Sequence, residues 1–171
     1  MDLQTLSQIA EIGGFVAVVA AIIFGMIQIR ETQRQRHDLA SVELVRSFQD
    51  SEFTAAFRII HSLPEDMPGS EFIAKGSDHI DAALLIGIKY ETMGLLVFRG
   101  VVPMDAVQEL IGGVAITLWK RLRPWVLSIR EDQSDELFLE WYQWLVERLE
   151  EHSPEKTEPA FIKHQNWALK K

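Results

Sequence analysis

The chain has 171 residues and a formal net charge of −8, with 47% hydrophobic and 25% charged residues. This length leaves room for one membrane helix and one compact domain of about 120 to 130 residues. The acidic balance argues against a nucleic-acid partner, and the hydrophobic content argues against a disordered chain. The absence of cysteine excludes disulfides and thiolate chemistry.

Residues 9–29 form the longest apolar run, IAEIGGFVAVVAAIIFGMIQI. No charged residue lies between Ile12 and Ile29, where Gln28 is the only strongly polar side chain. A helix of this length spans roughly 31 Å, which matches the hydrocarbon core of a bilayer. No Lys or Arg precedes the run and no obvious cleavage site follows it, so we favour a retained anchor over a signal peptide or a buried soluble helix. The sequence predicts a transmembrane helix here, after a short extracytoplasmic N-terminus at residues 1–8.

The first basic residues of the chain follow this run: Arg30, Arg34 and Arg36. An excess of arginine on one flank of a membrane helix places that flank in the cytoplasm. We therefore expect a single-pass protein with its N-terminus outside and its C-terminal domain in the cytoplasm. The three arginines are expected to lie at the membrane surface, among lipid headgroups, rather than to bind a ligand.

Small residues recur at every fourth position of the predicted anchor, at Gly13, Ala17, Ala21 and Gly25. They share one helix face, and such a face lets two membrane helices approach closely. Gly and Ala are also common in membrane helices generally, but the unbroken repeat favours helix–helix contact. The partner is either a second copy or another membrane protein. A pore formed by a ring of anchors is a further alternative.

The rest of the chain predicts an all-α fold. No glycine or proline occurs between Gly25 and Pro64, so the anchor helix is expected to continue as a stalk at residues 30–50. A cytoplasmic bundle of about four helices follows at residues 51–152, because no segment has the alternation and turn signals of a hairpin. The predicted helices are 52–62, with Asp50 or Ser51 as the N-cap, then 77–101, 104–123 and 136–152. A loop is predicted at 63–70, and Pro124 is expected to bend or restart the chain.

Residues 77–101 form the densest apolar segment after the anchor and are apolar around most of the helix circumference. Lys89, Glu91 and Arg99 occupy its second half and would be costly inside a bilayer. We therefore predict the central helix of the bundle rather than a second membrane span, with membrane contact left as the alternative.

The remaining residues, 153–171, contain two prolines and many charges, which favours an extended C-terminal arm. Phe161, Ile162 and Trp167 interrupt this polar arm. The sequence leaves open whether they dock on the domain, dock on a neighbouring subunit or stay disordered.

Motifs for catalysis are missing from the sequence. It contains no phosphate- or dinucleotide-binding glycine motif, no nucleophile elbow and no H-E-x-x-H zinc motif. No histidine follows a Glu by three residues, the spacing that di-iron bundles need. Asp78, His79 and Asp81 favour a helix start over a metal site. We therefore expect no catalytic residue, no cofactor and no metal.

Glu91 is expected to be half-buried because it lies among apolar positions of the central helix. A carboxylate in such a place is usually paired with an arginine, and Arg99, Arg121 and Arg123 are the candidates. The alternative is a functional carboxylate. Four tryptophans favour core packing over a ligand box: Trp119, Trp125, Trp141 and Trp144.

Four stretches together resemble a large family of small bacterial membrane proteins of unknown function. They are EIGGFVAVVAAIIFGMIQIRETQRQR, YETMGLLVFRGVVP, LWKRLRPWVLSIRED and FLEWYQWLVERL. These stretches cover most of residues 10–150. The resemblance implies a single N-terminal anchor followed by a small helical domain, and it implies no activity.

These features together predict a non-enzymatic protein of the bacterial inner membrane. It would self-associate or join a larger membrane assembly, as a scaffold or accessory subunit, through its anchor and its helical domain. The alternative is a ligand sensor or enzyme that uses a polar bundle interior around Glu91.

Overall fold

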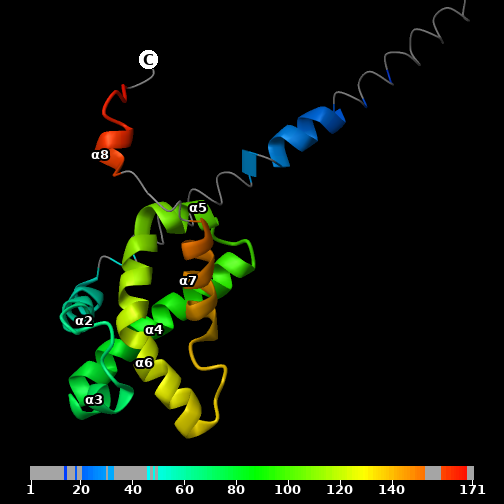
Figure 1. Cartoon of the computed structure of the whole chain (residues 1–171). Coiled ribbons are helices and arrows are strands. Elements are labelled where there is room, and N and C mark those ends of the chain that lie inside the picture. Colours follow the sequence, from blue (N-terminus) through cyan, green and yellow to red (C-terminus); the bar gives the residue numbers. More distant parts are fainter. Residues whose placement is uncertain are drawn as a thin grey trace, which may run out of the picture. The chain divides into compact units, whose positions relative to one another are not determined.

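The computed structural model describes residues 14, 18, 21–29, 31–32, 46, 48, 50–152 and 159–168. The chain divides into two compact units, Met1–Glu43 and Leu44–Lys171. Every regular element in the described ranges is a helix, so the protein is all-α there, as predicted (Figure 1). The division between the units falls within the predicted stalk, most of which lies outside the described residues.

In the first unit, residues 21–29 and 31–32 are helical. The hydroxyl of Thr32 donates to the carbonyl oxygen of Gln28 at 2.9 Å, which continues the helical pattern past Ile29. Of the predicted anchor, the structure describes residues 14, 18 and 21–29. Among the described parts of the chain, no helix reaches both the length and the apolar character needed to cross a membrane.

The second unit begins with α2, Ser51–His61, whose N-cap is Asp50 as predicted. The Asp50 carboxylate accepts the backbone N–H of Phe53 and also pairs with Lys89 of α4. These contacts hold the pKa of Asp50 below its usual value, the hydrogen bond from Lys89 having the largest effect. A short helix missed by the sequence analysis, α3, follows at Gly69–Ala74.

Tertiary contacts explain why α3 forms just after a segment rich in loop signals. Its Phe72 is fully buried and packs on Trp125 of α6, with ring centroids 5.2 Å apart. A helix of six residues is too short to be stable alone, so the packing of Phe72 on Trp125 supplies the stability that local helix propensity does not.

The central helix α4 spans Ser77–Phe98, which confirms the predicted core helix and ends it slightly earlier. It packs mainly against α2 and α7 (Figure 1). Its buried residues lie on one face, within an arc of about 140°, so burial is narrower than the apolar pattern of the sequence predicts. They are Ala82, Ala83, Ile86, Gly87, Tyr90, Met93, Gly94 and Val97. Gly100 follows with φ +67°, a left-handed conformation that glycine adopts without strain.

The next helical segment consists of α5 at Met104–Val107, a π-helical turn (η1) at Gln108–Gly112, and α6 at Gly113–Gln133. Pro124 lies inside α6, so the helix does not restart at this residue, which was one of the two outcomes expected from the sequence. A proline in a helix interior costs about 3 kcal/mol through its missing N–H and its ring clash. Here Leu122, Trp125 and Val126 are buried around it, and their packing offsets this cost.

The last helix of the bundle, α7, spans Glu140–His152 and begins later than the predicted Glu136. Leu139 has φ +56°, which interrupts the helical conformation just before α7. The Asp135 carboxylate accepts the N–H of Leu137 at 3.2 Å and so stabilises a turn rather than a helix start. In the predicted extended arm, α8 forms a short helix at Ala160–Lys163.

Aromatic rings fill the core between α4, α6 and α7. Tyr90 of α4 stacks on Tyr142 of α7, with centroids 4.7 Å apart and planes 14° from parallel. The Tyr142 hydroxyl donates to the carbonyl oxygen of Ala115 at 2.9 Å, while Trp119 meets the Tyr142 ring edge-on. Burial raises the pKa of both tyrosines, so both remain protonated.

At Gly94, α4 lies directly against the backbone of α7. A Cβ atom there would lie 2.1 Å from the backbone oxygen of Trp141, which cannot move without moving α7. We expect Gly94→Ala to lower the free energy of unfolding by about 1 to 3 kcal/mol. The measurement is urea unfolding of the full chain in detergent, followed by far-ultraviolet circular dichroism.

Gly113→Ala is the matched control, because a Cβ atom at Gly113 would meet nothing within 4 Å. It should leave stability unchanged or raise it by about 0.5 to 1 kcal/mol. Equal effects of the two substitutions would contradict the close approach of α7 to α4.

Candidate functional site

A polar contact joins α4 to the start of α7, at a place where the two helices pack closely. Gly87, Glu91 and Gly94 lie on one face of α4, because residues three and four apart in a helix are neighbours. A Cβ atom at Gly87 would come within 2.7 Å of the Leu139 side chain, just as one at Gly94 would meet the backbone of Trp141. We call this contact, which also includes Tyr142, the α4–α7 junction.

Glu91 supplies the polar contact at the junction. Its carboxylate accepts the backbone N–H of Tyr142 at 2.8 Å. Tyr142 lies in the first turn of α7, where N–H groups have no partner within their own helix. Glu91 therefore caps α7 from a different helix, at the end where a negative charge is favoured by the helix dipole.

Burial raises the pKa of Glu91 above its usual value of 4.5. The backbone N–H groups of Tyr142 and Trp141 oppose this shift, as does the charge of Arg130, while the nearby Glu140 adds to it. Desolvation is the largest of these effects, so burial at the junction disfavours the ionised form of the carboxylate relative to the protonated form.

The structure does not bring the predicted arginines to Glu91. Arg121 pairs with Glu65 at 3.1 Å and donates from Nε to the carbonyl oxygen of Leu63 at 3.0 Å. Arg99 and Arg123 are exposed. The backbone at the start of α7 takes the place of the expected ion pair, because its free N–H groups provide the donors.

Sequence reasoning missed Arg130, the arginine whose charge does reach Glu91. Its Nε donates to the carbonyl oxygen of Phe138 at 2.9 Å and its Nη1 to Gln143 at 2.7 Å. Arg130 thus ties the turn before α7 to the end of α6. No local pattern could identify it, because its partners are set by the chain reversal between α6 and α7.

Chemically, the junction is suited to holding two helices together. The Glu91 carboxylate is engaged by backbone donors, and Arg130 is engaged by a carbonyl and an amide. Within the part of the chain that the structure describes, no three His, Cys, Asp or Glu side chains gather as they would around a metal ion.

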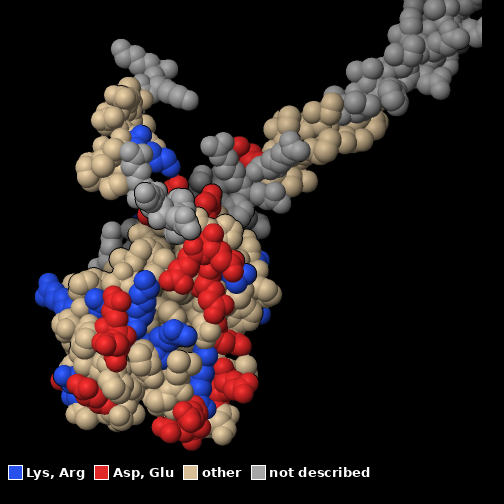
Figure 2. All heavy atoms as spheres, viewed as in Figure 1, with Lys and Arg blue, Asp and Glu red and all other residues tan. Residues whose placement is uncertain are grey.

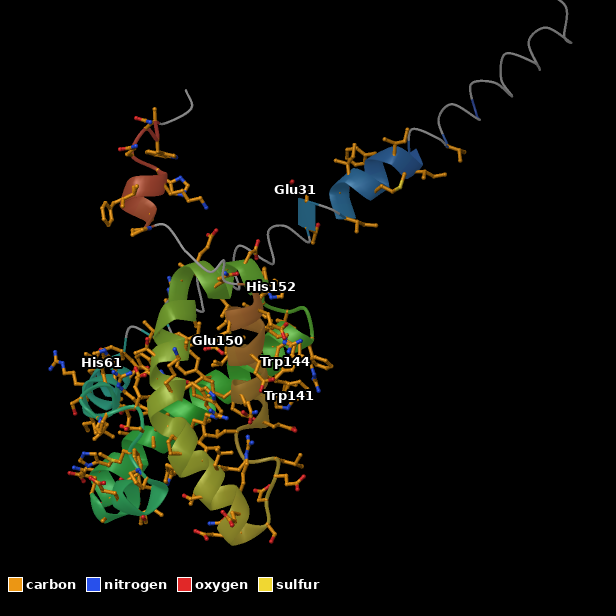
Figure 3. All side chains as sticks on the ribbon, in the orientation of Figure 1. Glu31, His61, Trp141, Trp144, Glu150 and His152 are labelled. Carbon is orange, nitrogen blue, oxygen red and sulfur yellow. The ribbon has the colours of Figure 1, made fainter. Side chains whose placement is uncertain are left out.

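An aromatic surface patch lies beside the junction. Phe98 is 59% exposed, and its ring centroid lies 4.7 Å from that of Trp141 and 5.7 Å from that of Trp144. Both tryptophans are half-buried on α7 (Figure 3). The predicted core packing is therefore confirmed for Trp119 and Trp125, which are buried, and is only partly right for this pair.

The other predicted site residues belong to the N-terminal unit. Ala21 is exposed and Gly25 half-exposed on the described helix, and a Cβ atom at Gly25 would meet nothing within 4 Å. The remaining predicted contact and surface residues lie outside the described residues: Gly13, Ala17, Arg30, Arg34 and Arg36.

Residues 15–149 match the family model of a domain of unknown function, DUF4760. The chain belongs to the DUF4760 family. This confirms the expected membership of a family without an assigned activity. No curated protein and no solved structure matches the chain.

The DUF4760 match includes both sides of the α4–α7 junction and the larger part of the predicted anchor. It ends within α7, so the segment after His152 lies outside it. The junction is therefore built from residues of the family domain, whereas α8 is an addition to it.

The pH dependence of stability tests the role of Glu91. Because its folded-state pKa is raised, folding favours the protonated form, and ionisation costs stability as pH rises above 4.5 through the raised value. Glu91→Gln keeps an oxygen acceptor for the Tyr142 N–H without the charge. Its free energy of unfolding should therefore increase relative to the wild type as pH rises from 4.5 to 7.

Glu91→Ala removes the acceptor altogether and should lower the free energy of unfolding by about 0.5 to 2 kcal/mol at pH 7. Urea unfolding at several pH values measures both variants. If Gln and Ala behaved alike, the capping role would be refuted. A Gln-to-wild-type difference that did not change with pH would contradict the raised pKa of Glu91.

Proposed function

We propose that this DUF4760 protein is a non-enzymatic scaffold or accessory subunit anchored in the bacterial inner membrane. It self-associates or joins a larger membrane assembly. The observation that carries the proposal is the helix at residues 21–29, whose large apolar side chains are 49% to 66% exposed. Such a surface needs an apolar surrounding, and a bilayer together with a neighbouring membrane helix provides one.

The orientation follows from the charges that flank the apolar run. Arg30, Arg34 and Arg36 stand on its C-terminal side, and no Lys or Arg precedes it. The proposal therefore places residues 1–8 outside the cell, residues 9–29 across the membrane and the helical bundle in the cytoplasm.

Two features of the bundle support a structural role. The Glu91 carboxylate is used to cap α7. The patch of Phe98, Trp141 and Trp144 leaves aromatic surface accessible on the bundle, which suits contact with another protein. The N-terminal helix and this patch offer two surfaces for assembly.

Membrane insertion is tested by placing charges on the exposed apolar helix. Val18→Arg combined with Ile22→Arg should cost roughly 5 to 7 kcal/mol of insertion free energy, because each arginine near the bilayer centre costs about 2.5 to 3.5 kcal/mol. We expect the fraction of protein that resists alkaline carbonate extraction from membranes to fall several-fold.

The matched control carries the same two charges on exposed apolar positions of the bundle, Ile73→Arg with Leu137→Arg. This variant should stay in the membrane fraction. Extraction of the wild type by carbonate would contradict the anchor. Digestion of the bundle by protease added from the periplasmic side would contradict the orientation.

Association is tested at the small-residue face. Gly25→Leu and Ala21→Leu place bulk where the described helix has open space, so neither should clash within one chain. If this face contacts another helix, each should weaken association by about tenfold, which corresponds to about 1.4 kcal/mol, because the leucine side chain keeps the two backbones apart. Cross-linking and mass measurement in detergent provide the readout.

Ile23→Phe is the control, because Ile23 lies on the opposite side of the helix from Gly25. It should leave the oligomer mass unchanged. A protein that is monomeric with no co-purifying partner would overturn the scaffold proposal. An unchanged oligomer mass in both leucine variants would show that the small-residue face does not mediate association.

A further inference from the structure

The C-terminal segment, residues 159–171, has a composition unlike the rest of the chain. Its sequence, PAFIKHQNWALKK, contains three lysines and neither Asp nor Glu, in a chain whose net charge is −8. The family match does not include it. Basic residues and aromatic residues are interleaved within it, and neither the junction nor the anchor makes use of them.

The described part of this segment presents its apolar side chains to solvent. Helix α8 begins after Pro159, and the following turn is closed by the N–H of Trp167, which donates to the carbonyl oxygen of His164 at 2.9 Å. Phe161 is 79% exposed and Trp167 70% exposed. These are the largest exposed fractions among the large apolar side chains that the structure describes.

Charge indicates what covers these side chains. On the face shown in Figure 2, Asp and Glu side chains gather over α7, the helix that precedes the segment. Glu147, Glu150 and Glu151 are exposed there. An anionic lipid surface would repel this part of the bundle and attract the lysine-containing segment.

We propose that residues 159–171 bind the surface of a bilayer containing anionic phospholipid, with Phe161 and Trp167 inserted at the level of the headgroups. Tryptophan and phenylalanine favour the membrane interface, and each lysine near an anionic surface strengthens binding by about fivefold. A segment this short binds weakly alone, so it acts as a second attachment beside the N-terminal anchor. The inference rests on the proposed membrane location for its proximity to lipid.

The test uses the full chain reconstituted into vesicles. Because the chain contains no cysteine, Ala168→Cys provides a single site for the environment-sensitive fluorophore NBD. Vesicles of phosphatidylcholine alone are compared with vesicles that also contain phosphatidylglycerol. We expect a several-fold rise in NBD emission only with phosphatidylglycerol, and quenching of that emission by lipids with a nitroxide on the acyl chain.

Two variants separate charge from insertion. Replacing Lys163, Lys170 and Lys171 by glutamine should weaken the lipid-dependent response by roughly 100-fold, at about fivefold for each lysine. Phe161→Ser with Trp167→Ser should abolish nitroxide quenching. The matched control, Arg58→Gln with Lys75→Gln and Lys120→Gln, removes the same charge from exposed positions of the bundle and should leave the response intact.

Each other outcome overturns the proposal. Equal emission in both vesicle types excludes recognition of anionic lipid, and unchanged emission in both excludes membrane contact. A rise without nitroxide quenching indicates docking on protein, either the acidic surface of α7 or a neighbouring copy. Flotation of the labelled protein with carbonate-washed vesicles reports on the anchor separately, so a failure of this segment is distinguishable from a failure of the anchor.

Discussion

The bundle depends on the direct contact between α4 and the beginning of α7. Two glycines, Gly87 and Gly94, remove side chains from one face of α4, so that Leu139 and the backbone of Trp141 can lie against it. Between them Glu91 accepts the N–H of Tyr142 at 2.8 Å. The absence of two side chains allows the two helices to approach. The Glu91 carboxylate accepts a backbone N–H that the approach would otherwise leave buried without an acceptor.

This contact determines how the aromatic residues divide between core and surface. With α7 in this position, Tyr142 reaches inward to stack on Tyr90 and to donate to Ala115. The adjacent Trp141 and the next-turn Trp144 lie along the edge of the bundle, where Phe98 joins them. The same helix therefore supplies both the centre of the core and the aromatic surface proposed for assembly.

The proposed function relates three chemically distinct parts of one chain. An apolar helix near the N-terminus exposes large side chains, an acidic bundle is closed by the α4–α7 junction, and a basic, aromatic segment follows at the C-terminus. Attachment to a bilayer at both ends would hold the bundle near the membrane while its acidic surface stays in water. A scaffold needs this kind of fixed placement more than it needs a reactive group.

The sequence by itself determined the features that depend on neighbouring residues. The apolar pattern of residues 77–101 identified the core helix, and Asp50 was identified as the cap of α2, because periodicity and capping are local. The half-buried state of Glu91 was also predicted from its apolar neighbours.

Only the tertiary structure decided the partner of Glu91, which lies 51 residues away in the chain. It also decided the continuation of α6 through Pro124, the formation of α3 and the late start of α7. For α3 and α6, packing against residues distant in the sequence outweighed the local signals. The start of α7 combines the local turn at Asp135 with the hydrogen bond from Arg130 to the carbonyl oxygen of Phe138. Such contacts form only when the chain is folded, so no reading of neighbouring residues could determine them.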